Sequence, residues 1–221
     1  MRALLISLIL TVAAQAGTIT GSVRAVGKSG LESGGGGGKY ESRKFKFAER
    51  VDYSALHEFV VYIEGPVAGK SEPPKKPLQI VVQKDAQFSP HLLPAVVGTT
   101  VEWPNQDEIS HNAFSMSDSK EFDLGLYKEK TKQVTFDKPG RVDVFCSIHT
   151  TMHCIVLVLE NPFFATTDAR GRYRIDGVPP GTYRLKAWHE RVPSQVREIT
   201  VPADGELKED FTLTIAGLPE Y

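Results

Sequence analysis

The sequence predicts an all-β protein made of two β-sandwiches. The chain of 221 residues contains 19 glycines and 14 prolines, so turns are frequent and the segments between them are short. Those segments are rich in β-branched and aromatic residues, and residues 78–160 lack the 3.6-residue periodicity of a long helix. With 41% hydrophobic and 24% charged residues, the composition excludes collagen-like, coiled-coil and wholly disordered proteins.

The first 16 residues have the pattern of a secretory signal peptide. Arg2 precedes an uncharged apolar run, and Ala14 and Ala16 are the small residues of a cleavage site. The run is too short to span the roughly 30 Å hydrocarbon core of a bilayer, which disfavours a membrane anchor. We therefore predict cleavage near Ala16 and a periplasmic or secreted bacterial protein without stable membrane insertion.

The charges of the chain are almost balanced. Lys and Arg number 26 and Asp and Glu number 27, which gives a formal net charge of −1. Such a chain lacks the excess of positive charge that attracts proteins to nucleic acid. We expect no nucleic-acid partner.

Two strands are predicted in the N-terminal part of the chain. Residues 17–26 alternate between apolar and polar positions, and residues 59–63 form a short apolar run. Residues 27–56 between them contain five consecutive glycines, whose high chain entropy predicts a flexible insert. Residues 67–77 are rich in proline and lysine and predict a linker.

The segment 78–160 contains strand signals that are bounded by turn-forming residues. We predict that these strands form one compact sandwich. The predicted strands are 78–83, 99–103, 132–136, 141–146 and 154–159.

The pattern changes after Asn161 and predicts a second, smaller sandwich. A turn at 168–171 precedes a strand in which Tyr173 and Ile175 face inward. A Pro-Pro-Gly turn leads to a further strand, and two more strands are predicted at 197–201 and 210–215.

The strongest chemical signal lies between residues 141 and 159. Val142, Val144 and Cys146 share one face of a strand, which places the thiol at the rim of the core. The loop that follows carries His149 and Met152, so one hairpin offers a thiol, an imidazole and a thioether as Cys-x2-His-x2-Met. His111, in the loop after strand 99–103, is a candidate for a fourth ligand.

A cysteine and two histidines in a plane, with a weak axial methionine, form the ligand set of a blue-copper electron-transfer site. Two alternatives remain open at this point. Cys146 and Cys154 are the two cysteines of a chain that we expect to be exported, and they could form a disulfide. Together with His111 and His149 they could also form a structural zinc site.

Residues 78–160 resemble a cupredoxin, the family of plastocyanin and amicyanin, whose fold is a Greek-key β-sandwich. The resemblance covers the whole segment. It is carried by the opening run 79–107, by His111-Asn112 and by the closing motif Cys146-x2-His149-x2-Met152. The short interval between His149 and Met152 is most similar to that of amicyanin.

This resemblance implies one copper ion per chain, cycling between Cu(I) and Cu(II). It implies a set of equatorial copper ligands, namely His111, Cys146 and His149. It also implies that Met152 is the axial ligand and that Asn112 fixes the loop beside the thiolate. His153 directly follows Met152 and is a rival for the axial position, and Cys154 is unusual for the family.

Residues 166–185 resemble the transthyretin-like (prealbumin-like) domain, also called the carboxypeptidase regulatory-like domain. The family has two strands before this motif, and their patterns occur here at 20–23 and 60–63. We therefore predict a discontinuous domain, 17–66 plus 161–221, into which the cupredoxin segment is inserted.

These observations predict an exported blue-copper electron carrier that is not an enzyme. The resemblance implies a periplasmic redox partner protein, such as a dehydrogenase or a cytochrome. One alternative is a copper-binding or trafficking module without redox turnover. Another is a carbohydrate- or protein-binding protein in which the transthyretin-like domain does the work.

Overall fold

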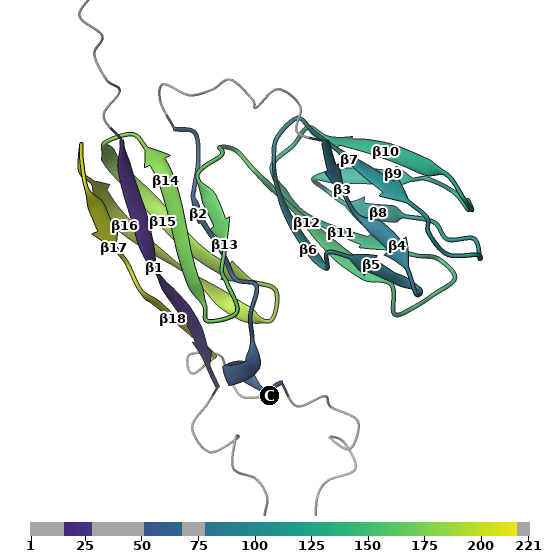
Figure 1. Cartoon of the computed structure of the whole chain (residues 1–221), viewed down its shortest axis with the longest axis horizontal. Helices are drawn as coiled ribbons and strands as arrows, with labels where there is room; N and C mark the ends of the chain where they lie inside the picture. The colour runs from purple at the N-terminus through teal and green to yellow at the C-terminus, as the bar shows by residue number, and fades with distance from the viewer. Residues whose placement is uncertain (1–15, 28–50, 68–77, 216–221) are drawn as a thin grey trace, which may run out of the picture.

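The computed structural model describes residues 16–27, 51–67 and 78–215, and these are almost entirely β (Figure 1). The predicted all-β fold is therefore confirmed. Three predicted segments lie mostly outside the described residues: the signal peptide at 1–16, the insert at 27–56 and the linker at 67–77. Within the described ranges, no helix is long and apolar enough to cross a membrane.

One sandwich combines strands from both ends of the chain, and we call it the split sandwich. In its first sheet β1 pairs with three strands, antiparallel with β14 and parallel with β17 and β18. The members of this sheet are β1 (Gly17–Val26), β14 (Arg172–Val178), β17 (Glu206–Lys208) and β18 (Phe211–Thr214). Its second sheet has the order β13 (Phe164–Thr166), β2 (Val60–Ile63), β15 (Gly181–His189) and β16 (Val192–Val201).

The strands between these two sets form the central sandwich (Figure 1). One sheet has the order β10 (Thr131–Phe136), β7 (Thr99–Pro104) and β3 (Leu78–Ile80). The other has the order β6 (Leu92–Val96), β12 (His153–Leu159), β11 (Gly140–Phe145), β8 (Phe114–Ser117) and β9 (Lys120–Asp123). A hairpin of β4 (Val82–Lys84) and β5 (Gln87–Ser89) completes it.

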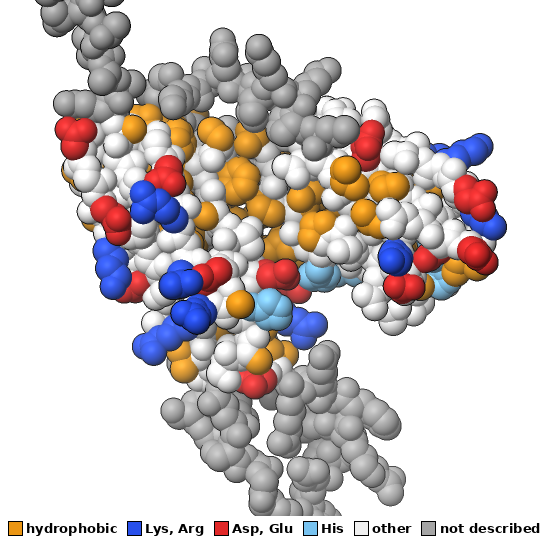
Figure 2. Space-filling model, viewed as in Figure 1, with side chains coloured by type: hydrophobic (Ala, Val, Ile, Leu, Met, Phe, Trp, Pro, Cys, Tyr) orange, Lys and Arg blue, Asp and Glu red, His pale blue; other side chains and the backbone are white. Residues whose placement is uncertain are grey.

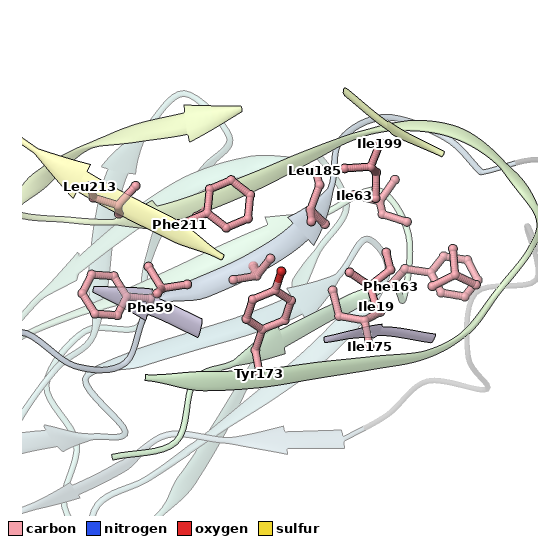
Figure 3. Close-up of a cluster of buried hydrophobic side chains, with 14 of the residues drawn as sticks. Ile19, Phe59, Ile63, Phe163, Tyr173, Ile175, Leu185, Ile199, Phe211 and Leu213 are labelled. Carbon is pink, nitrogen blue, oxygen red and sulfur yellow. The ribbon is translucent and has the colours of Figure 1, made fainter. Parts of the chain in front are cut away.

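Each sandwich has its own core. Figure 3 shows the core of the split sandwich, in which residues of β1 and β2 meet those of β14 to β18. Tyr173 and Ile175 are buried there, while Arg172 and Arg174 on the same strand are exposed, as the alternation predicts. The core of the central sandwich is built around Trp103, with β7, β10, β11 and β12 contributing.

β12 is buried on both of its faces. Val156 and Val158 belong to the core of the central sandwich. Leu157 and Leu159 instead form a cluster with Val60 of β2, against which side chains of both sandwiches pack. The apolar contact between the two sandwiches explains why this strand is apolar from Cys154 to Leu159 instead of alternating.

The end of the predicted flexible insert has a defined structure, which corrects that part of the prediction. A short 3-10 helix, η2 (Tyr53–Ala55), begins after Asp52, whose side chain accepts a hydrogen bond from the Ser54 amide at 2.9 Å. Tyr53 and Leu56 pack against the core of the split sandwich. The partial burial of these two side chains holds the segment against the core.

Substitution of Gly21 tests the close approach between β1 and the Glu209 backbone, which lies between β17 and β18. A Cβ atom here would lie 1.8 Å from the Glu209 carbonyl oxygen, so Gly21→Ala should destabilise the protein by about 3 kcal/mol. Gly98→Ala is the control, because its φ is +88° but nothing lies within 4 Å. It should lose only about 1 kcal/mol, from backbone conformation. Equal losses in chemical denaturation would contradict the steric argument.

Candidate metal centre

The loop between β11 and β12 is closed by its own backbone. The Cys146 amide donates to the Met152 carbonyl at 3.3 Å, and the Met152 amide donates to the His149 carbonyl at 3.0 Å. Phe145 and His153 are paired across the two strands on either side of this loop. The tight connection therefore holds Cys146 and His149 at one end of the central sandwich.

Three of the four predicted ligands converge at this end. His111, Cys146 and His149 form a group whose potential ligand atoms lie within 4.8 Å of one another. The Nδ1 atoms of His111 and His149 are 3.0 Å apart, and Cys146 Sγ lies 3.8 Å from His149 Nδ1. Met152 is buried in the same core cluster as Cys146.

These separations fit a metal ion bound between the three side chains. Two bonds of about 2.0 Å from one ion to nitrogen, at an angle of about 95°, place the two nitrogen atoms about 3.0 Å apart. A bond of about 2.3 Å from the same ion to sulfur, at about 120° to one of the nitrogen bonds, places the sulfur about 3.7 Å from that nitrogen. His111 is fully buried and Cys146 is nearly so, which keeps bulk water away from two of the three donors. The donor set is the soft and borderline set that copper prefers.

Asp107 determines which nitrogen of His111 is available. Its Oδ2 lies 2.7 Å from His111 Nε2, so Nε2 carries the proton and Nδ1 faces the cluster. Hydrogen bonds from the backbone amide of Ala86, and from His111 and the Asp85 amide, lower the pKa of Asp107 despite partial desolvation. Sequence reasoning missed this residue, although it stands four positions before His111.

The loop that carries His111 is held by further hydrogen bonds. Asn105 donates from Nδ2 to the carbonyls of Ile109 and Tyr127, both at 2.9 Å. His111 and Tyr127 exchange backbone hydrogen bonds of 3.1 and 2.8 Å. Because both ends of this loop are tied to the sandwich, the imidazole of His111 has a defined position.

Asn112 connects the two loops of the site. Its Oδ1 accepts hydrogen bonds from the Ser147 amide at 2.8 Å and the Ser147 hydroxyl at 3.0 Å. Ser147 directly follows Cys146, so Asn112 lies next to the thiol-bearing loop, as the resemblance implies. The side-chain Nδ2 of Asn112 donates a hydrogen bond to Asp123 Oδ1 at 3.3 Å.

The rival residues His153 and Cys154 lie outside this cluster. His153 Nε2 is 2.9 Å from Asp143 Oδ1, and its ring stacks on Phe145. Both cysteines are free thiols, which contradicts the disulfide alternative. Burial raises the pKa of the Cys154 thiol, and this residue sits within β12. The zinc alternative that required Cys154 is therefore disfavoured.

The surroundings of His149 differ from those of His111. His149 is partly exposed, and the neighbouring Ile148 is 51% exposed. Two further exposed apolar side chains lie on the segments that hold His111. Ile109 stands two residues before His111. Leu126 directly precedes Tyr127, which is the backbone partner of His111. Of the four predicted ligands, His149 is therefore the one that lies closest to solvent, beside an exposed isoleucine.

Comparisons with known proteins match both parts of the chain. The family model for the carboxypeptidase regulatory-like domain matches residues 156–214. No curated protein sequence matched the chain. A solved structure of a copper-containing nitrite reductase from Thermus scotoductus SA-01 is similar, with 28% identity and a TM-score of 0.37, over 44% of this chain and 25% of that one. This chain thus spans about a quarter of the reductase.

Two smaller proteins are similar over nearly their whole length. A Cu(I) form of an amicyanin mutant has 20% identity and a TM-score of 0.35, over 44% of this chain and 97% of that one. A purple cupredoxin from Nitrosopumilus maritimus has 25% identity and a TM-score of 0.31, over 36% of this chain and 98% of that one. The two families that the sequence resembles therefore both occur among the matches.

Replacing Asp107 by asparagine tests its control of the His111 tautomer. The amide of Asp107→Asn can donate to Nε2 and leave the proton on Nδ1, so metal affinity should fall about 10- to 100-fold. Competition with a Cu(I) chelator measures the affinity, and nitrogen-15 NMR of the metal-free protein reports the tautomer. Asp85→Asn removes a charge from the same region and keeps the Asp107–His111 hydrogen bond, so it should change neither readout.

Proposed function

We propose that the protein is an exported blue-copper electron carrier, with one copper ion per chain. The observation that carries the proposal is the convergence of His111, Cys146 and His149 at spacings that suit a single ion. Met152 is proposed as the axial ligand, since it closes the same loop and is buried beside Cys146. Copper supplies a one-electron couple between Cu(I) and Cu(II) when it is bound.

The chain's own residues keep the site rigid and dry. Asp107 orients His111, Asn112 holds the loop that follows Cys146, and backbone hydrogen bonds close that loop. Ligands held in fixed positions move little when the copper ion changes oxidation state, and a small change in ligand positions favours fast electron transfer. Burial of His111 and Cys146 also favours a carrier over a trafficking module, which must release its ion.

The proposed route for electrons is the exposed side of His149. Ile148, Ile109 and Leu126 are exposed apolar side chains. We propose that they form the surface on which a periplasmic redox protein, such as a dehydrogenase or a cytochrome, docks transiently. We propose that the protein is not an enzyme, because four protein ligands would leave no coordination position for a substrate.

Addition of Cu(II) to the reduced, metal-free protein tests the copper centre. We expect an intense thiolate-to-copper absorption band and a narrow copper hyperfine splitting in EPR. Cys146→Ser should abolish both, whereas Cys154→Ser should keep both because Cys154 lies outside the cluster. A colourless complex in the unmodified chain would contradict the electron-carrier proposal.

The docking surface is tested separately by Ile148→Lys. This change should slow electron exchange with a redox partner at least tenfold and leave copper content and the visible spectrum unchanged. Met116→Lys is the control, because Met116 is also exposed but lies on β8. Equal rates for the unmodified chain and Ile148→Lys would show that electrons leave elsewhere.

A further inference from the structure

A second group of metal-ligating side chains lies where the two sandwiches meet. His91, His153 and Glu190 have potential ligand atoms within 4.8 Å of one another. His91 precedes β6 and His153 begins β12, whereas Glu190 lies in the turn between β15 and β16. The group therefore joins the central sandwich to the split sandwich. Figure 2 shows acidic and histidine side chains next to one another in this region.

One nitrogen of His91 has a definite partner. Nδ1 lies 3.2 Å from the carbonyl oxygen of His153, which can only accept, so Nδ1 carries a proton. In the neutral ring Nε2 then has a lone pair, and it lies 2.9 Å from Glu190 Oε1. Two electron-rich atoms at this distance require a positive centre between them, which is either a proton or a metal ion.

His153 is oriented in a similar way. Its Nε2 lies 2.9 Å from Asp143 Oδ1, and Asp143 is held by the Arg141 guanidinium through contacts of 2.7 and 2.6 Å. A carboxylate paired with a guanidinium is a hydrogen-bond acceptor. The proton of His153 then sits on Nε2, and Nδ1 is the nitrogen left for a ligand.

The spacing and exposure also suit an ion. In a tetrahedral site, bonds of about 2.1 Å separate two ligand atoms by about 3.4 Å. His91 Nε2 and Glu190 Oε1 are 2.9 Å apart, so they need to separate by only about 0.5 Å to hold an ion between them. The His91 and Glu190 side chains are 43% and 19% exposed, so an ion can enter from solvent. A cavity of about 500 Å³ borders both residues and leaves room for a water molecule as a further ligand.

We propose that His91, His153 and Glu190 form a second metal site, for a divalent first-row ion of the zinc type. Two imidazoles and one carboxylate are a known ligand set for zinc sites with an open position. The ion would tie the two sandwiches together, because Glu190 comes from one and the histidines from the other. This site is independent of the proposed copper centre.

Zinc binding to the full chain, with copper already bound, tests the proposal. After incubation with Zn²⁺ and gel filtration, we expect one zinc ion per chain. Zinc retention should fall at least tenfold in His91→Ala and in Glu190→Gln, with copper content unchanged. His57→Ala is the matched control, since His57 borders the same cavity but is outside the group.

A second readout separates this site from the copper centre. Zn²⁺ should raise the thermal unfolding temperature of the unmodified chain and not that of Glu190→Gln. In a Cys146→Ala background, His91→Ala should still remove one equivalent of zinc, whether or not the copper proposal is correct. Absence of zinc from the unmodified chain, or full retention in both His91→Ala and Glu190→Gln, would overturn the second site.

Discussion

Burial of β12 on both faces is the constraint on which the rest of the structure depends. One face completes the core of the central sandwich, and the other contacts β2 of the split sandwich. The same strand starts at the end of the Cys146–Met152 loop, so the loop that carries three of the four proposed metal ligands ends in a strand that is buried along almost its whole length. Rigid packing of this strand limits how far the ligands can move.

Much of the fold and the centre of the site could be predicted from local patterns. Alternation in residues 141–146 placed Cys146 after two core valines, and its spacing to His149 is a property of one short loop. The strands β8 and β9 were missed, because Phe114–Ser117 and Lys120–Asp123 lack a clear apolar alternation. Their place in the sheet depends on the pairing of β8 with β11, which is distant in sequence.

Residues that act through distant contacts were harder to predict. Asp107 matters because the loop after β7 turns its carboxylate toward His111 and toward two backbone amides of the β4–β5 turn. His91 and Glu190 belong to different sandwiches, and nothing in either local sequence predicts their contact. Long-range juxtapositions of this kind follow from the sheet pairing and the packing between sandwiches.

The split sandwich has a consequence for how the chain acquires its structure. β1 is the hub of a sheet whose other strands all come after residue 171, and β2 lies between two strands that follow residue 163. β1 and β2 are synthesised well before the strands that pair with them, so they stay unpaired until those strands are available. The central sandwich has its partners close together and can fold earlier, so a chain truncated near its C-terminus would leave exposed strand edges that favour aggregation.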